Sequence, residues 1–373
     1  MSSTSAPAPG QAPLVASSAA ELIRRNGTDP EVAGRPAVRD GDRIWTHGEV
    51  YEEAKRYAAL FTERLPAGAP PHVGVLADNI PEYLFTFAGA ALVGATVVGL
   101  NHTRQGEHLL RDVHHADVGL LLTEPAHRAD LDPIRGDLGV PVLEAGDELE
   151  AALPATADDP GEEPDVDARW ALIFTSGTSS APKAVICSQR RLLVTGNRMR
   201  LLLELGPDDV GYVCMPLFHS NAVMVGWAPS IVAGASVGLA RRFSVSAWLP
   251  DVRRYGATWF NYTGKPLSYL VASPEQPDDA DNPLRIAFGN EGAPDVIAAF
   301  SRRFGVKVID AFGATEGGVA LNREDGMPPG AMGRAGDTVQ VVDEDGEPKP
   351  PARFDADGRL LNPEECVGEI VNT

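Results

Sequence analysis

The chain has 373 residues, of which 43% are hydrophobic, and it carries a formal net charge of −20 at pH 7. A chain of this length is expected to fold into about two or three packing units. The negative charge argues against nucleic acid or an anionic membrane surface as a direct partner. Its three cysteines show no metal-ligand spacing, which indicates reduced thiols in a cytoplasmic protein.

The first half of the chain alternates between helical and strand patterns. Residues 1–16 are rich in Ser, Ala and Pro and are expected to form a disordered tail, because they lack the basic start and apolar run of a signal peptide. Helical periodicity predicts a helix over 50–61, and short apolar segments predict buried strands at 74–76 and 119–123. The acidic, Pro-rich segment 151–167 is expected to be a surface linker.

Two uncharged runs, 83–100 and 222–240, are long enough to suggest membrane spans. Each contains an interior Gly-Ala step, in Leu92-Val-Gly-Ala-Thr-Val97 and in Val232-Ala-Gly-Ala-Ser-Val237. A buried helix that ends at a glycine and leads into a buried parallel strand explains both runs better. The repetition of this plan suggests two similar subdomains and no transmembrane span.

The alternation of helices and strands predicts an α/β fold. We expect two α/β subdomains, with mostly parallel sheets flanked by helices, over residues 17–325. The start of a small β-rich subdomain is expected over 326–373, with β-hairpins in its turn-rich part at 343–363.

The loop Thr175-Ser-Gly-Thr-Ser-Ser-Ala-Pro-Lys183 follows an apolar strand. Backbone N–H groups, hydroxyls and a lysine together suit a polyphosphate. The spacing differs from a Walker loop, and Pro182 disfavours a helix through Lys183, so we expect no helix directly after this loop. Taken alone, the segment also fits an ordinary polar surface loop.

Three further loops strengthen the nucleotide interpretation. Val308-Ile-Asp-Ala-Phe-Gly-Ala-Thr-Glu-Gly-Gly318 is a strand that runs into a Gly-rich turn, and a carboxylate beside phosphates is what Mg²⁺ requires. The other two are Phe288-Gly-Asn-Glu-Gly-Ala-Pro294 and Val213-Cys-Met-Pro-Leu-Phe-His-Ser-Asn221. By themselves, Glu316 fits an ordinary turn carboxylate and His219 a buried core histidine.

In order and spacing, these motifs resemble the adenylate-forming superfamily, which includes acyl-CoA synthetases, luciferases and adenylation domains. The motifs concerned are Thr175-Ser-Gly-Thr-Ser-Ser-Ala-Pro-Lys183, Pro216-Leu-Phe-His219 and Phe312-Gly-Ala-Thr-Glu316. Within the superfamily, Gly74–Tyr83, Gly94–Gly106 and Asn261–Leu270 are most similar to fatty acyl-CoA ligases of the fatty-acid-transport-protein type.

The resemblance implies that a carboxylate attacks ATP to give an acyl-adenylate, and that CoA then takes the acyl group. It assigns catalytic roles to Lys183, His219, Thr315 and Glu316, with Glu316 holding Mg²⁺. The ATP-binding residues implied are Thr175, Ser176, Gly177, Thr178, Ser179, Lys183, Gly292, Ala293, Pro294, Asp310, Ala311, Phe312, Gly313 and Thr315. The acid is expected to contact His219, Asn221, Val223, Tyr262, Thr263 and Gly264.

Several positions depart from the family pattern. Ser179-Ser180 replaces the usual Thr-Gly, Ala184 replaces Gly, Phe312 replaces the commoner Tyr, and the adenine-side loop reads Glu291-Gly-Ala-Pro294. Family members also continue into a mobile C-terminal domain that is expected to be absent here, so the isolated chain is expected to be weakly active or inactive.

The most direct interpretation is the core of a ligase for a medium- to long-chain fatty acid that uses ATP, Mg²⁺ and CoA, with a homodimer as the expected assembly. Two alternatives stay open. The acid is instead an aryl or polyketide-type acid, or the chain is a non-catalytic module that binds an acyl group or a nucleotide.

Overall fold

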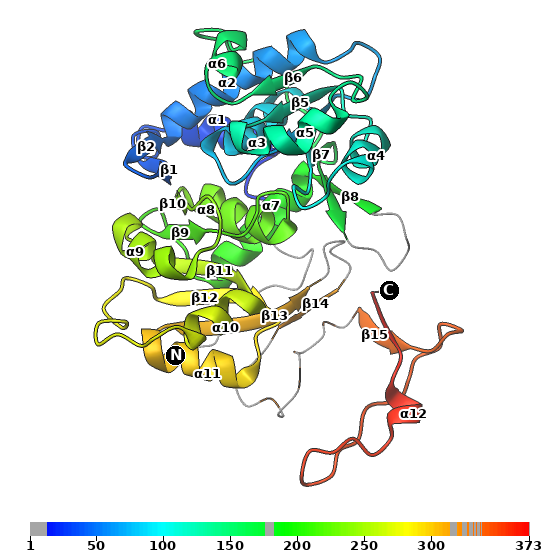
Figure 1. The fold of residues 1–373 in the computed structure, drawn as a ribbon. Helices are drawn as coiled ribbons and strands as arrows, with labels where there is room; N and C mark the ends of the chain where they lie inside the picture. The colour runs from blue at the N-terminus through cyan, green and yellow to red at the C-terminus, as the bar shows by residue number, and fades with distance from the viewer. Residues whose placement is uncertain are drawn as a thin grey trace.

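The computed structural model describes residues 13–175, 183–313, 319–322, 327, 331, 333, 336 and 338–372. Two large sheets lie one above the other with helices around them (Figure 1). The first has six strands in the order β6-β5-β3-β4-β7-β8, all parallel except the antiparallel pair β7 and β8. Its strands are β3 (His72–Leu76), β4 (Thr96–Gly99), β5 (Leu120–Thr123), β6 (Val142–Glu144), β7 (Arg169–Thr175) and β8 (Lys183–Ser188).

The second sheet has eight strands in the order β14-β13-β12-β11-β9-β10-β1-β2. The strands from β13 to β1 are parallel, and β14 and β2 are antiparallel edges. They are β1 (Pro36–Asp40), β2 (Arg43–Thr46), β9 (Val210–Val213), β10 (Ser236–Leu239), β11 (Trp259–Thr263), β12 (Ile286–Asn290), β13 (Lys307–Gly313) and β14 (Ala320–Asn322). The predicted α/β class with mostly parallel sheets is therefore confirmed.

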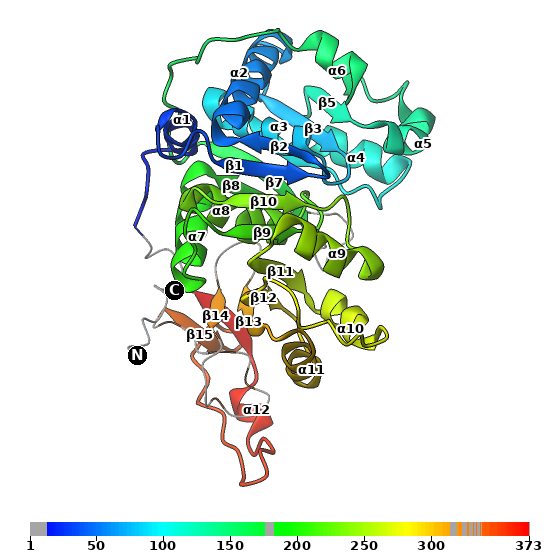
Figure 2. The same ribbon diagram turned by 90° about the vertical axis from the view of Figure 1, so that its left-hand side faces the viewer.

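The two subdomains are interlocked by the N-terminal part of the chain. Strand β1 precedes the whole first sheet in sequence, yet it joins the second sheet beside β10 (Figure 2). Between them, Val38 is paired with Val237. The sequence patterns did not reveal this insertion, because a short strand carries no signal for which sheet it will join.

The helices cover the faces of both sheets. They are α1 (Ala19–Thr28), α2 (His47–Arg64), α3 (Pro81–Val93), α4 (Glu107–His115), α5 (Arg128–Leu131), α6 (Asp147–Ala152), α7 (Gln189–Leu202), α8 (Ala228–Ala233), α9 (Val245–Tyr255), α10 (Gly264–Ala272) and α11 (Pro294–Phe304). Shorter turns are the 3₁₀ helices η1 (Pro125–His127) and η2 (Asp132–Ile134), and η3 (Asn221–Trp227) is a π-helix.

Local sequence explains where these helices begin. The side chain of Thr46 accepts a hydrogen bond from Glu49 N–H, and the Glu49 carboxylate accepts one from Thr46 N–H. This reciprocal pair satisfies two of the donors that every helix start leaves free, and it fixes the start of α2. The helix predicted over 50–61 lies inside α2.

The predicted repetition of helix, glycine and strand is confirmed in both subdomains. Helix α3 ends at Gly94 (φ 68°) before β4, and helix α8 ends at Gly234 (φ 64°) before β10. Both glycines take the left-handed conformation that other residues adopt only at a cost. In the described part of the chain, no helix has the length and apolarity that a membrane crossing requires.

Aromatic packing joins the two subdomains in the core. Phe87 of α3 stacks near Trp170 of β7, at 4.8 Å between ring centroids, and near Trp227 of η3, at 5.8 Å. All three rings are buried. Because helix α3 belongs to the first subdomain and η3 to the second, this cluster fixes the position of one relative to the other.

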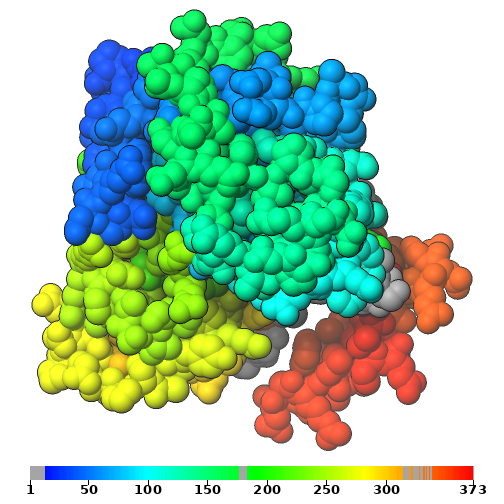
Figure 3. Space-filling model, turned by 45° about the horizontal axis from the view of Figure 1, so that its top comes forward, coloured from blue at the N-terminus to red at the C-terminus, as the bar shows by residue number. Residues whose placement is uncertain are grey.

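The C-terminal residues form an arm that stands away from the main body (Figure 3). Strand β15 (Val339–Val342) pairs antiparallel with β16 (Glu369–Asn372), and α12 (Pro363–Cys366) lies between them in sequence. The β-hairpins predicted over 343–363 form only as two short turns, each with one antiparallel bridge, Val342–Pro348 and Phe354–Leu360. Backbone hydrogen bonds flank each bridge, from Lys349 N–H to the Val341 carbonyl at 2.8 Å and from Leu361 N–H to the Arg353 carbonyl at 2.8 Å.

Candidate functional site

The ends of the predicted phosphate loop lie opposite each other on two antiparallel strands. Thr175 closes β7, Lys183 opens β8, and the two residues are direct partners in the ladder. The prediction that no helix follows this loop directly is confirmed, because Lys183 begins a strand. The loop residues Ser176, Gly177, Thr178 and Ser179 lie outside the described part of the chain.

The predicted acid-binding loop runs from Met215 to His219, directly after β9. The N–H of His219 donates to the Pro216 carbonyl at 2.9 Å, which turns the loop back into η3. His219 is exposed, yet desolvation by the surrounding protein, together with repulsion from His102, lowers its pKa. Near neutral pH, the ring is therefore expected to be neutral and able to accept or donate a hydrogen bond.

The π-helix η3 carries the next two predicted acid-site residues. The Asn221 side chain donates to the Tyr262 carbonyl at 3.1 Å and accepts from the Asn261 amide at 2.7 Å. Val223 is fully buried, so it forms part of the core beneath the loop. The sequence pattern predicts an ordinary helix here. The wider π-turns were missed because no residue pattern marks them, although such turns are frequent at functional sites.

The predicted adenine side is built on the carboxyl ends of β11, β12 and β13, three neighbouring parallel strands. Asp310 Oδ2 accepts hydrogen bonds from the Tyr262 hydroxyl at 2.8 Å and from Gly292 N–H at 2.9 Å. This one oxygen ties all three segments together. Ala293 and Pro294 follow as the N-cap and first residue of α11.

Close backbone approach requires glycine at two positions of this platform. A Cβ on Gly264 would lie 1.9 Å from the Glu291 carbonyl oxygen, and a Cβ on Gly289 would lie 2.2 Å from the Tyr262 carbonyl oxygen. The turn at Thr263 and Gly264 is therefore packed directly on the loop after β12. Within that loop, Glu291 adopts a φ of 64°, a conformation that is costly for a residue with a Cβ.

The last predicted nucleotide residues lie at the end of β13. Ala311, Phe312 and Gly313 pair antiparallel with β14. Phe312 is 38% exposed, so its side chain is accessible for stacking on a flat base. Thr315 and Glu316, the expected α-phosphate and Mg²⁺ residues, lie outside the described residues.

The site also has neighbours to which the sequence motifs assign no role. His102, after β4, lies edge-on to Phe218 with ring centroids 5.1 Å apart, and it stacks on His127 at the same centroid distance. Burial and the proximity of His127 lower the pKa of His102. The signal in the sequence that points to this region is the family resemblance of Gly94–Gly106, a segment that contains His102.

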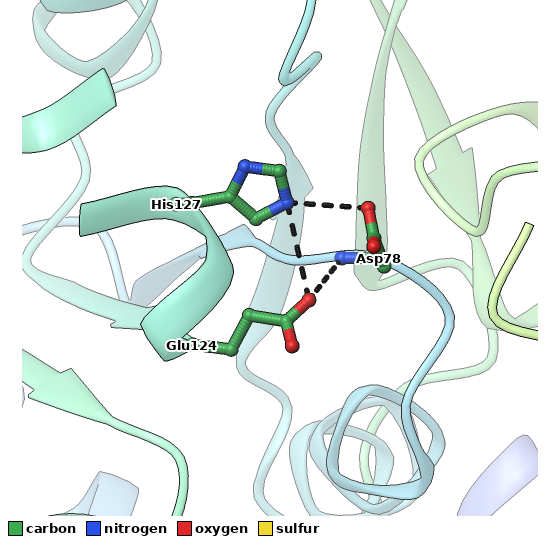
Figure 4. Close-up of side chains that lie close together, drawn as sticks. All are labelled: Asp78, Glu124 and His127. Atoms are coloured by element: carbon green, nitrogen blue, oxygen red, sulfur yellow. Dashed lines mark hydrogen bonds and ion pairs between the residues drawn. The ribbon is translucent and has the colours of Figure 1, made fainter. Parts of the chain in front are cut away.

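His127 also belongs to a cluster of charged side chains with Asp78 and Glu124 (Figure 4). His127 Nε2 is 3.3 Å from Asp78 Oδ1, and Asp78 N–H donates to Glu124 Oε1 at 2.7 Å. His127 Nδ1 is 2.9 Å from Asp130 Oδ2. Arg241, at the end of β10, hydrogen-bonds to the other oxygen of Glu124 and lies 3.5 Å from Asp78 Oδ2.

This cluster resembles a cation site in its spacing. Among the described residues, Asp78, Glu124 and His127 are the one set of His, Cys, Asp or Glu side chains with three ligand atoms within 4.8 Å of one another. Both carboxylates, however, already face the Arg241 guanidinium, and Glu124 also accepts the Asp78 N–H. We therefore interpret the group as an ion-pair network between the subdomains.

Comparison with known proteins agrees with this geometry. A family model described as AMP-binding enzyme matches residues 28–371. The steroid-22-oyl-CoA synthetase of Rhodococcus jostii (strain RHA1) is 43% identical over 360 residues, which cover 94% of this chain and 63% of that protein. The medium/long-chain-fatty-acid–CoA ligase FadD17 of Mycobacterium tuberculosis is 46% identical over 329 residues, which cover 85% of this chain and 60% of that protein. The chain thus spans less than two thirds of the length of these relatives.

Solved structures share the fold. A putative long-chain-fatty-acid CoA ligase from Rhodopseudomonas palustris superposes with a TM-score of 0.78 at 19% identity, covering 92% of this chain and 98% of that one. The N-terminal domain of FACL13 from Mycobacterium tuberculosis superposes with a TM-score of 0.76 at 19% identity, covering 93% and 86% of the two chains. At this level of identity, the likeness establishes the fold alone.

Proposed function

Because this chain belongs to the AMP-binding enzyme family, we propose that it is the nucleotide- and acid-binding part of an ATP-dependent acid–thiol ligase. In the first step, a carboxylate oxygen of the acid attacks the α-phosphorus of ATP and pyrophosphate leaves. In the second, the sulfur of CoA attacks the acyl carbonyl, AMP leaves, and the thiol proton is released. The observation that carries the proposal is the convergence of Tyr262 and Gly292 on Asp310, a platform that Asn221, two residues after His219, joins through the Tyr262 carbonyl.

The first step is a displacement in line with the leaving pyrophosphate, so the protein acts mainly by positioning and by charge stabilisation. Thr175 and Lys183 contact the outer phosphates together with Ser176, Gly177, Thr178 and Ser179. Lys183 supplies a compact positive charge there, which a chain of net charge −20 needs locally. Thr315 contacts the α-phosphate and Glu316 binds Mg²⁺, the ion that screens the phosphate charge.

Adenine lies between the loop Gly292–Pro294 and the end of β13, with Phe312 stacked on the base. The acid approaches from the side of His219 and Asn221. His219 contacts its carboxylate, and the turn Tyr262–Gly264 borders its acyl group.

The three unpaired cysteines, two of them buried, fit a cytoplasmic location for such an enzyme.

The substrate proposed first is a medium- to long-chain fatty acid, since the FadD17 relative is named for such acids. A second candidate is a carboxylic acid with a bulky ring system. It is favoured by the relative of comparable identity that is named a steroid-22-oyl-CoA synthetase. The two candidates share the same chemistry at the carboxylate and differ in the shape of the group beyond it.

Calorimetric titration of this chain tests the proposal. Mg·ATP, AMP and acyl-sulfamoyladenosines with a fatty or a steroid side-chain acyl group are titrated separately. We expect all of the nucleotides to bind, and the tighter of the two acyl classes identifies the acid. Lys183→Ala is expected to weaken Mg·ATP about tenfold and AMP much less, because it removes a contact to the outer phosphates.

Lys307→Ala is the matched control. Lys307 is also an exposed strand residue, but it begins β13, whereas the proposed nucleotide residues lie where that strand ends. It is expected to leave the affinity for Mg·ATP unchanged. Failure of the unaltered chain to bind any adenine nucleotide, or equal losses in the two lysine variants, would overturn the proposal.

A further inference from the structure

The side chain of Asn79 connects the first subdomain to the backbone of the acid-binding loop. Asn79 follows β3, and it is 2% exposed. Its Nδ2 donates to the Met215 carbonyl at 2.9 Å and to the Ala240 carbonyl at 3.0 Å. Its Oδ1 accepts the N–H of Leu217 at 2.9 Å. Every one of these partners belongs to the second subdomain.

The asparagine side chain satisfies all three of these backbone groups. The amide offers two N–H donors and a carbonyl acceptor, and both kinds of group are used here. An aspartate retains the acceptor for Leu217 but places an oxygen against two carbonyls. An alanine leaves three buried backbone groups without partners, each of which then carries an unrecovered desolvation cost.

The opposite side of the loop is held by the neighbouring strand of the same sheet. Gly99 closes β4, and a Cβ there would lie 2.9 Å from Phe218 Cα, so the missing side chain allows the backbone of the loop to approach. His102 then contacts the Phe218 ring edge-on. The carboxyl ends of β3 and β4 therefore hold Leu217 and Phe218, the two residues that precede His219.

The position of Asn79 is itself fixed by its neighbours. Asp78 is tied to Glu124 and His127 (Figure 4). Its Oδ2 also lies 3.5 Å from the Arg241 guanidinium. The N–H of Asn79 also donates to the Arg241 carbonyl at 3.2 Å. The segment that presents the amide is thus anchored on both subdomains, and it cannot shift without breaking these contacts.

We propose that Asn79 is a positioning residue for the acid site. It holds the backbone of Met215–Leu217 in the conformation that presents His219 to the substrate carboxylate. This inference rests on the proposed function, because it takes the loop of His219 as the acid-binding loop. The nucleotide platform at Asp310 lies on other strands, so binding of the nucleotide alone should not depend on Asn79.

The test compares two probes on the same protein, AMP and hexadecanoyl-sulfamoyladenosine, by calorimetry. In the unaltered chain, the acylated probe is expected to bind more tightly than AMP. Asn79→Ala and Asn79→Asp are expected to weaken the acylated probe by about tenfold or more and to leave AMP within about twofold. Hydrogen exchange at the Leu217 amide should become faster in Asn79→Ala, which loses the acceptor.

Two further variants separate positioning from general destabilisation. Asn197→Ala removes an equally buried asparagine in α7, which is 1% exposed and bonds to the Pro13 carbonyl away from the loop. It is expected to leave both affinities unchanged. Gly99→Ala disturbs the loop from the other side while keeping Asn79, and it should reproduce the selective loss of the acylated probe even if the Asn79 variants do not fold.

The outcomes distinguish the two proposals. If the unaltered chain binds neither probe, the proposed function fails and this inference fails with it. If the unaltered chain binds both probes but Asn79 and Gly99 variants retain the preference for the acylated one, only the positioning role is overturned. A loss of equal size for both probes also overturns it.

Discussion

The phenol hydroxyl of Tyr262 donates a hydrogen bond of 2.8 Å to Asp310 Oδ2, the same oxygen that accepts the Gly292 N–H. Tyr262 is fully buried, so water does not replace the bond when it is removed. The two residues lie on β11 and β13, with β12 between them. The shape of the proposed adenine platform therefore depends on a contact between side chains of non-adjacent strands.

Tyr262→Phe removes this donor and keeps the Gly292 N–H on Asp310. We expect the free energy of unfolding to fall by about 1 kcal/mol and the affinity for AMP to fall about tenfold, because the platform loses the hydrogen bond that joins β11 to β13. Tyr212→Phe is the matched control. Tyr212 of β9 is equally buried and donates to Asp251 of helix α9 at 3.2 Å. Denaturant unfolding and calorimetry measure both effects, and a similar loss of AMP affinity in the two variants would contradict the assignment.

Phe312→Ala tests the stacking role of the exposed ring at the end of β13. We expect AMP and ATP to bind several-fold more weakly, because an aromatic face on a base contributes about 1 kcal/mol or more. Phe354→Ala serves for comparison, since that ring is 55% exposed on the C-terminal arm. Calorimetric titration should show no change of affinity in Phe354→Ala. Unaltered nucleotide binding in Phe312→Ala would place the base elsewhere.

Glu291→Gly is expected to stabilise the protein. The backbone of Glu291 has a φ of 64°, which glycine adopts without a steric penalty. The gain in the free energy of unfolding should be about 0.5–1 kcal/mol, after the greater flexibility of glycine in the unfolded chain is included. Glu275→Gly, in a loop without positive φ, is expected to destabilise slightly. Thermal unfolding of the two variants decides the point, since a lower midpoint for Glu291→Gly would show that no strain is relieved.

His47 is expected to make stability depend on pH. Burial lowers its pKa from an ordinary value of 6.5 to about 4. Between these two values the unfolded chain binds a proton that the folded protein does not, so stability falls as the pH falls from about 6.5 to 4. The contribution over that window is of the order of 3 kcal/mol.

The pH effect is isolated by comparing the unaltered chain with His47→Gln. Carboxylates titrate in both proteins, so the difference between their unfolding free energies at pH 7.5 and pH 5 reports His47. We expect the unaltered chain to lose more stability on acidification than the variant does. Parallel pH profiles would contradict the prediction, because they would mean that the pKa of His47 is the same in the folded and unfolded chains.

Much of the architecture followed from local sequence. The runs at 83–100 and 222–240 were predicted as helix, glycine and buried strand, because a residue in the left-handed conformation at a helix end is commonly glycine. Pro182 predicted that no helix follows the phosphate loop, since proline restricts the residues around it. These features depend on a few adjacent residues, which is why the linear pattern contains them.

Local sequence predicts only part of the candidate site. Its loops were located by their glycines, hydroxyls and charged residues, and Tyr262, Asp310 and Gly292 were each selected. Only the tertiary structure, which aligns β11, β12 and β13 in register, shows that one oxygen of Asp310 bonds to both Tyr262 and Gly292. The π-helix over Asn221–Trp227 was also unforeseen, because packing against Phe87 and Trp170 acts on it from distant parts of the chain.

What the sequence by itself determined was the class of fold, the order of its elements and the chemical types at the loops, all of which rest on interactions between near neighbours. The tertiary structure alone decided that β1 joins the second sheet and that Asn79 holds the loop of His219 across the subdomain boundary. A buried amide must find backbone partners, but which ones it finds depends on how segments far apart in the chain come together.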